Sequence, residues 1–128
     1  MPTAALEEYL ESIYKLAQAG PVRPTQIAEA VGVSGPTVTA TLRRLAMHGL
    51  VSREGTKVVL TEEGLQRSLD IVRRHRVAET FLVDTLGLDW DAAHEEACTL
   101  EHALSPRVLA ALEEFLDNPA VEQAKDAP

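Results

Sequence analysis

The chain has 128 residues and a mass of 13.9 kDa, with 45% hydrophobic and 25% charged residues. This composition is typical of one globular domain or two small ones and excludes a disordered chain. Its apolar stretches are far shorter than the roughly 18–20 residues that cross a bilayer. The net charge of −8 and the pI near 4.9 argue at first sight against a nucleic-acid-binding protein.

The location of the protein is predicted from its cysteine content and its first residues. Cys98 is the single cysteine, so an intramolecular disulfide is impossible and a reducing compartment is expected. The N-terminus lacks a basic and apolar signal region. We therefore expect a cytoplasmic protein with no membrane partner.

The first half of the chain predicts a helix-turn-helix. Residues 4–19 repeat apolar side chains at helical spacing and predict a first helix. A short helix over 25–30, capped by Thr25, precedes a turn with glycine and a second helix that Ser34 caps and Gly49 ends. Two short helices joined by such a turn are typical of the helix-turn-helix motif.

The segment after this motif predicts a β-hairpin. Residues 50–60 contain two β-branched runs around Glu54-Gly55. A hairpin directly after a helix-turn-helix is the wing of a winged helix. Residues 1–62 are therefore predicted to form a winged helix-turn-helix DNA-binding domain.

The second half is predicted to be all helical. A long helix over 62–86 is followed by a helix from Asp89 to Leu104 and a last helix through Leu116. The capping residues are Thr61, Asp89 and Ser105. We predict a mainly α fold, with a helical metal-binding and dimerisation domain over 63–116 and a flexible tail over 117–128.

Charge is distributed unevenly along the chain. Residues 21–60 hold five basic and two acidic residues, a net charge of +3, whereas residues 77–128 hold two basic and twelve acidic residues, a net charge of −10. A solvated surface and a phosphate-binding surface are equally compatible with five basic residues alone. The polar second helix of the helix-turn-helix, with Thr37, Thr39 and Arg43, favours DNA, because a major groove accepts such a helix.

Three predicted helices carry residues that can bind a metal. His94, Cys98, Glu101 and His102 are spaced so that all four lie on one face of the 89–104 helix. Glu8 and Glu11 share a face of the first helix, and His75 and Glu79 share a face of the long one. Each pair alone is also compatible with a solvated surface, and a lone cysteine with a small buried side chain. The Cys98-Glu101-His102 triplet is stronger, because sulfur, oxygen and nitrogen donors converge at this spacing.

Three runs of the sequence resemble one known family. They are SGPTVT at 34–39, HRVAETFL at 75–82 and HEEACTLEHALS at 94–105. Over about residues 4–116 the chain resembles the diphtheria toxin repressor family of metal-dependent transcriptional regulators. The resemblance implies a winged-helix DNA-binding domain, a helical dimerisation domain and metal sites between them.

The resemblance also implies which residues bind metal. Glu8, Cys98, Glu101 and His102 match the family's activation site, and His75, Glu79 and His94 match an ancillary site of iron-type members. In manganese-type members helix one carries two carboxylates, as Glu8 and Glu11 do here, and His75 joins a binuclear cluster. Glu8 is thus manganese-like and Cys98 iron-like. The expected cofactor is Mn²⁺ or Fe²⁺, with Co²⁺, Ni²⁺ or Zn²⁺ as substitutes.

For DNA, the resemblance implies contacts from the second helix and the wing. The best-known iron-type members read bases with a glutamine where this chain has Ala40, so Ser34, Pro36 and Thr37 are expected to read bases instead. The candidate DNA-binding residues are Gln26, Ser34, Pro36, Thr37, Thr39, Arg43, Arg44, Arg53 and Lys57. The SH3-like third domain of longer members is expected to be absent or cut from this chain.

The predicted function is a homodimeric repressor, without catalytic residues, that controls metal-ion homeostasis. Metal pins helix one to the dimer domain and places two recognition helices on a palindromic double-stranded operator. Phe81, Leu82, Trp90 and the apolar face of the last helix are the predicted dimer contacts.

Three alternatives use the same residues differently. A metal-independent winged-helix regulator would use the His/Cys/Glu face for structure only. A zinc hydrolase would use Glu101 or Glu96 as its base, although the H-E-x-x-H signature is missing and the basic winged segment would have no role. A thiol sensor would use Cys98.

Overall fold

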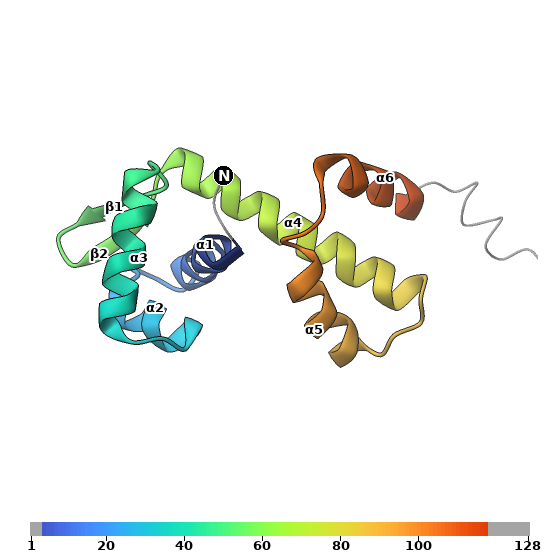
Figure 1. The fold of residues 1–128 in the computed structure, drawn as a ribbon, viewed down its shortest axis with the longest axis horizontal. Helices are drawn as coiled ribbons and strands as arrows, with labels where there is room; N and C mark the ends of the chain where they lie inside the picture. Colours follow the sequence, from blue (N-terminus) through green and yellow to red (C-terminus); the bar gives the residue numbers. More distant parts are fainter. Residues whose placement is uncertain (1–3, 118–128) are drawn as a thin grey trace, which may run out of the picture. The chain divides into compact units, whose positions relative to one another are not determined.

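The computed structural model describes residues 4–117, in which six α-helices and one two-stranded sheet form (Figure 1). The predicted mainly α fold class is confirmed. The chain divides into two compact units, Met1–Ile71 and Val72–Pro128, with α4 (Glu62–Asp84) running through the division. The domain limits derived from the sequence stay a prediction. The predicted flexible tail, apart from Asp117, lies outside the described residues.

The first unit is a winged helix-turn-helix. Its elements are α1 (Ala4–Ala17), α2 (Pro24–Val31), α3 (Gly35–Met47), β1 (Val51–Glu54) and β2 (Lys57–Leu60). The two strands pair antiparallel, with Val51 opposite Leu60. α1 packs against α2 and β2, and α3 packs against α2 and β1.

Local capping explains where the helix-turn-helix begins and ends. Ser34 caps α3 as predicted, because its Oγ accepts a hydrogen bond from the Thr37 amide at 3.3 Å. The predicted Thr25 cap is wrong. α2 begins at Pro24, since proline suits a first helical turn, and Gln26 Oε1 accepts from the amide of the N-cap residue Arg23 at 2.8 Å.

The hairpin turn lies one residue later than predicted. Glu54 pairs with Lys57 and ends β1, so the loop consists of Gly55 and Thr56. Gly55 has φ +65°, a left-handed conformation that glycine adopts without steric cost.

Large aliphatic side chains fill the core of the first unit. Leu10, Ile13, Ile27 and Leu45 are fully buried there. Ser68 is buried beside this core, and its Oγ donates to the carbonyls of Gly64 (2.8 Å) and Leu10 (3.2 Å). Gly64 lies so close to the chain at Leu50 that an added Cβ would be 1.9 Å from the Leu50 carbonyl oxygen.

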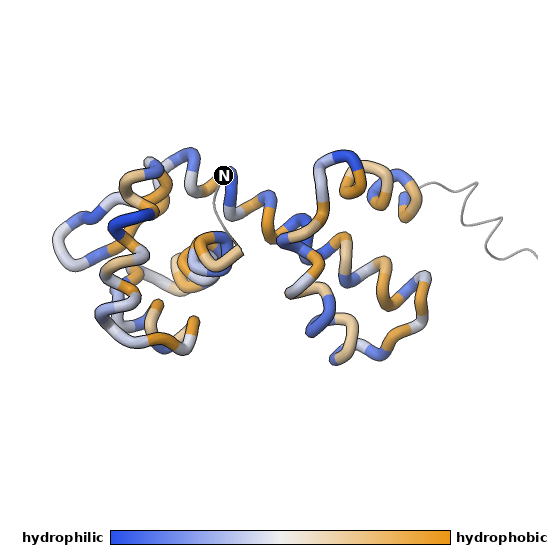
Figure 2. The backbone as a smooth tube through the Cα atoms, in the orientation of Figure 1, coloured by the Kyte–Doolittle hydropathy of each residue, from blue (hydrophilic) through white to orange (hydrophobic). Residues whose placement is uncertain are grey.

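The second unit consists of the C-terminal part of α4, α5 (Trp90–Leu100) and α6 (Pro106–Asp117). Figure 1 shows α5 and α6 on two sides of α4. Hydrophilic and hydrophobic segments alternate along α4 (Figure 2). Asp89 caps α5 and Ser105 caps α6, as predicted, by accepting hydrogen bonds from the amides of Ala92 and Val108.

Two predictions for the second unit are wrong. α5 ends at Leu100 rather than at about Leu104, although Glu101 keeps a helical backbone conformation and its amide donates to the Ala97 carbonyl. Leu82 is buried in a small core with Ala78, Ala93 and Ala97, so it cannot be a dimer contact. None of the helices within residues 4–117 has the length and apolar character needed to cross a membrane.

Candidate metal centre and nucleic-acid interface

Five predicted ligands of the second unit lie together. His75 and Glu79 are one turn apart on α4, and His94 and Cys98 are one turn apart on α5. Glu101 is the first residue after α5. We call these five residues, His75, Glu79, His94, Cys98 and Glu101, the donor cluster.

Short distances connect the donor cluster. Glu79 Oε2 lies 3.1 Å from His75 Nε2 and 2.9 Å from His94 Nδ1, and the two imidazole nitrogens are 3.2 Å apart. On its other side, His75 Nδ1 lies 2.9 Å from Glu101 Oε1. Cys98 Sγ lies 4.0 Å from both His75 Nδ1 and His94 Nε2. The residues that the resemblance divides between two sites are therefore contiguous here.

Burial and charge differ across the donor cluster. The side chain of Glu101 is 1% exposed and that of His75 is 14% exposed, whereas that of His94 is 47% exposed. The hydrogen bond from His94 lowers the pKa of Glu79, against a smaller opposing effect of burial. Glu79 is thus an ionised acceptor at neutral pH.

Arg74 supports the turn that follows α5, a role that the sequence did not reveal. Its Nη1 donates to the carbonyl of Leu104 at 2.8 Å. The neighbouring Arg73 instead reaches α6, where it forms an ion pair with Glu113. The sequence could not show that these two consecutive arginines have different partners, because the contacts depend on how the helices pack.

The other predicted ligands are His102 of the second unit and Glu8 and Glu11 of the first. His102 is half-buried beyond the end of α5 and is not among the clustered donors of residues 4–117. Glu8 and Glu11 are on α1 in the first unit, where Glu8 is exposed and Glu11 pairs with Lys15 at 3.4 Å.

The donor cluster fits a divalent cation by its chemistry and spacing. The ligand atoms of His75, His94 and Cys98 lie within 4.8 Å of one another. Donors about 2.0–2.3 Å from a tetrahedral metal are roughly 3.3–3.8 Å apart. The observed separations between donor atoms of the cluster, 2.9–4.0 Å, span that range. Small side-chain shifts would therefore be enough to place these atoms around one cation. Imidazole, thiolate and carboxylate are ligands of Fe²⁺ and Zn²⁺, and carboxylate and imidazole of Mn²⁺.

The predicted DNA-binding side chains all lie on the surface of the first unit. They are Gln26, Ser34, Pro36, Thr37, Thr39, Arg43, Arg44, Arg53 and Lys57. Several of them also stabilise their own helix: Ser34 and Gln26 cap, and Thr39 Oγ1 donates to the Gly35 carbonyl at 3.1 Å. Arg43 and Arg53 border a recess of about 230 Å³ between α3 and β1.

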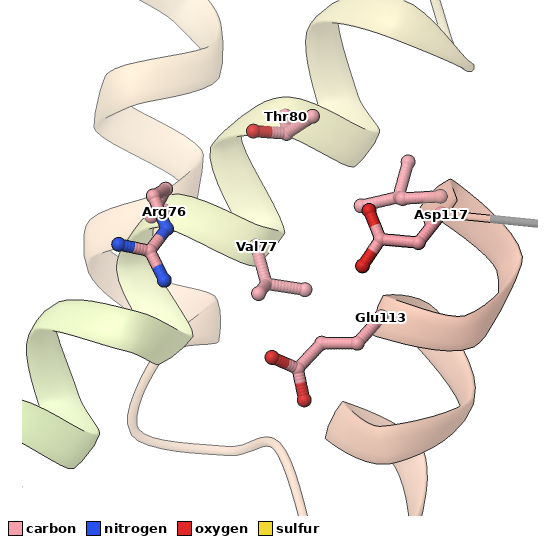
Figure 3. Close-up of a pocket in the computed structure, with 6 residues that line it drawn as sticks. Arg76, Val77, Thr80, Glu113 and Asp117 are labelled. Atoms are coloured by element: carbon pink, nitrogen blue, oxygen red, sulfur yellow. The ribbon is translucent and has the colours of Figure 1, made fainter.

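A second recess, of about 240 Å³, lies between α4 and α6. Figure 3 shows Arg76, Val77 and Thr80 on its α4 side and the carboxylates of Glu113 and Asp117 extending from α6. The recess contains neither imidazole nor thiol.

Comparison with known proteins decides the family. Residues 1–59 match the sequence profile of the iron dependent repressor N-terminal DNA binding domain. Residues 61–127 match that of the iron dependent repressor metal binding and dimerisation domain. The chain belongs to the iron-dependent repressor family. This membership confirms the resemblance to the diphtheria toxin repressors.

Individual relatives place the chain within this family. The iron-dependent repressor IdeR of Mycobacterium tuberculosis is 42% identical over 116 residues, covering 88% of this chain and 50% of that protein. A helix-turn-helix transcriptional regulator of Methanocaldococcus jannaschii is 36% identical, covering 88% of this chain and 93% of its own. A solved manganese-dependent transcriptional repressor in complex with manganese is 42% identical, with a TM-score of 0.79, covering 89% of this chain and 53% of its own. The chain thus spans about half the length of the mycobacterial relative.

Proposed function

We propose that this chain is a divalent-metal-activated transcriptional repressor that binds a palindromic double-stranded operator as a homodimer and controls metal-ion homeostasis. The observation that carries the proposal is the donor cluster. The same chain also contains a winged helix-turn-helix whose basic side chains are exposed. The relatives are described as iron-dependent and manganese-dependent repressors, which supports the same function. We propose a cytoplasmic protein with no catalytic role.

The proposed ligands are the donor cluster together with Glu8, Glu11 and His102. A divalent cation would supply positive charge that offsets the carboxylates and joins donors from separate helices. Thiolate and imidazole donors favour Fe²⁺, whereas the carboxylates of α1 favour Mn²⁺. Both metals therefore remain proposed cofactors, with Co²⁺, Ni²⁺ or Zn²⁺ as substitutes.

In this proposal metal regulates DNA binding because both units contribute ligands to the same ions. Glu8 and Glu11 of α1 join Cys98, Glu101 and His102 around the same ions, which fixes α1 and with it the winged helix. Two recognition helices of a homodimer are then held about 34 Å apart, one DNA turn. Because metal and DNA select the same conformation, each strengthens the binding of the other.

The roles proposed on DNA follow from position and charge. Ser34, Pro36 and Thr37, at the exposed N-terminal end of α3, read base edges. Thr39, Arg43 and Arg44 along α3 contact phosphates. The remaining proposed DNA contacts come from Gln26 of α2 and from Arg53 and Lys57 of the wing.

The test begins with a selection from a random-sequence DNA duplex pool, because the operator is unidentified. The selection is run with Mn²⁺, with Fe²⁺ under anaerobic conditions, with Co²⁺, with Zn²⁺ and with chelator. We expect enrichment of an inverted repeat only with metal, and loss of this enrichment in His75→Ala. The control Glu113→Gln removes a carboxylate outside the donor cluster and is expected to behave as wild type. Enrichment of the same repeat with chelator would contradict the proposal.

One observation favours a second candidate, a metal-independent winged-helix regulator. His75 hydrogen-bonds with Glu101 and His94 with Glu79, contacts that also suit a purely structural role of these side chains. In that case operator binding survives chelation and His75→Ala affects folding only. The zinc hydrolase and the thiol sensor have no comparable support.

A further inference from the structure

Trp90, the first residue of α5, lies against one ligand of the donor cluster. Its indole stacks on the His94 imidazole with ring centroids 5.5 Å apart and an angle of 9° between the planes. His75 approaches the same imidazole edge-on, with centroids 4.8 Å apart at 71°. The His94 ring is therefore contacted on a face by Trp90 and along an edge by His75.

Core packing does not account for the position of Trp90. The residue is 63% exposed and forms one wall of an open recess of about 190 Å³ that Glu79 also borders. Its spacing of four residues from His94 places both side chains on one face of α5. The parallel stack is therefore a specific contact of an exposed aromatic ring.

The orientation of His94 matters because its two nitrogens have different partners. Nδ1 lies 2.9 Å from Glu79 Oε2, and Nε2 lies 4.0 Å from Cys98 Sγ. Rotation of the ring about the Cβ–Cγ bond, out of its present plane, would take Nδ1 away from Glu79 and Nε2 away from Cys98. An indole stacked on the imidazole restrains this rotation, and neighbours that orient a ligand commonly change metal affinity 10- to 100-fold, roughly.

We propose that Trp90 is a positioning residue for cation binding: its indole holds the His94 imidazole so that Nδ1 faces Glu79 and Nε2 faces Cys98. The inference rests on the proposed function, because it assumes that His94 is a ligand. Trp90 was predicted from the sequence to be a dimer contact, and this proposal assigns it a different role.

The experiment compares Trp90→Leu, which keeps apolar bulk, with Trp90→Phe, which keeps an aromatic face. Val108→Ala removes an exposed apolar side chain from α6 and is the matched control. The first readout is the proton chemical shift of the His94 ring in the metal-free full chain. We expect the ring-current shift to disappear in Trp90→Leu and to persist in Trp90→Phe and Val108→Ala.

The second readout is the affinity for Co²⁺ and Zn²⁺ by calorimetry. We expect Trp90→Leu to bind on the order of 10-fold more weakly, with Trp90→Phe and Val108→Ala close to wild type. Unchanged affinity in Trp90→Leu, or equal loss in Trp90→Phe, would overturn the positioning role while leaving the proposed function intact. Absence of metal binding by the wild type would instead refute the proposed function, and the metal-free ring-current shifts would still report whether the stack exists.

Discussion

The two units of this chain are stabilised in different ways. The first has a core of large aliphatic side chains, including Leu10, Ile27 and Leu45, in which the buried hydroxyl of Ser68 is hydrogen-bonded. The second has a small buried core cluster of Leu82 with three alanines, Ala78, Ala93 and Ala97. Beside that core lies the donor cluster, with the buried carboxylate Glu101. The first unit is thus expected to fold on apolar burial alone, whereas the second gains stability when its polar interior binds a ligand.

The largest expected effect tests the tight packing of the first unit. Gly64→Ala places a Cβ 1.9 Å from the Leu50 carbonyl oxygen, a backbone atom that cannot move away cheaply. We expect a loss of about 3 kcal/mol in the free energy of unfolding, measured by urea denaturation. Gly35→Ala is the control, because nothing lies within 4 Å of its added Cβ. Equal effects of the two substitutions would show that the close approach at Gly64 does not limit stability.

The next prediction concerns the ligand dependence of the second unit. Zn²⁺ at 100 times its dissociation constant is expected to add about 2.7 kcal/mol to the free energy of unfolding. Hydrogen exchange should show the gain of protection in α5 and the second half of α4, with α3 unchanged. His94→Ala should abolish the gain and Glu113→Gln should retain it. An equal gain of hydrogen-exchange protection in α3 and α5 would contradict the expectation that only the second unit is stabilised by the cation.

A smaller effect is expected from charge on the winged helix. Arg43→Ala removes one exposed guanidinium from α3 and should lower the slope of log affinity against log salt by about 0.9 for duplex DNA. The control Arg107→Ala removes an exposed arginine from α6 and should leave the slope unchanged. Binding is measured by fluorescence anisotropy over a salt series. A similar change for both variants would argue that net charge, rather than this surface, attracts DNA.

The smallest effect is the pH dependence of an ion pair in the second unit. The hydrogen bond from Arg73 lowers the pKa of Glu113 below its ordinary value of 4.5. A lowered folded-state pKa stabilises the fold above that ordinary value, and the contribution is lost as pH falls through the folded-state pKa. Because both side chains are partly exposed, Glu113→Gln should cost at most about 1 kcal/mol at pH 7. Urea denaturation at pH 7 and pH 3 measures the difference, and a cost at pH 3 as large as at pH 7 would exclude the ion pair as its source.

Most of the helix boundaries could be predicted because local signals control them. Ser34, Thr61, Asp89 and Ser105 all cap helices in the structure as expected. The failures have local causes too. Pro24 starts α2 before Thr25, and α5 ends at Leu100 even though the sequence pattern continues to Leu104.

The candidate metal centre was predictable as a set of residue types but not as an arrangement. Helical spacing correctly indicated that His75 and Glu79, and likewise His94 and Cys98, share a face. It could not show that α4 and α5 bring the two pairs within 2.9 Å of each other. Its grouping of His102 with Cys98 and Glu101 stays a prediction.

The sequence by itself determined the winged helix-turn-helix, the mainly α architecture, the family and the residue types able to bind a cation. Those properties depend on periodicity, capping and motif, which act over a few neighbouring residues. Only the tertiary structure decided that Glu101 is buried beside His75, that Arg74 holds the turn after α5 and that Trp90 stacks on His94. The first two of these contacts join segments far apart in the chain, and the third depends on a side-chain orientation that spacing does not specify.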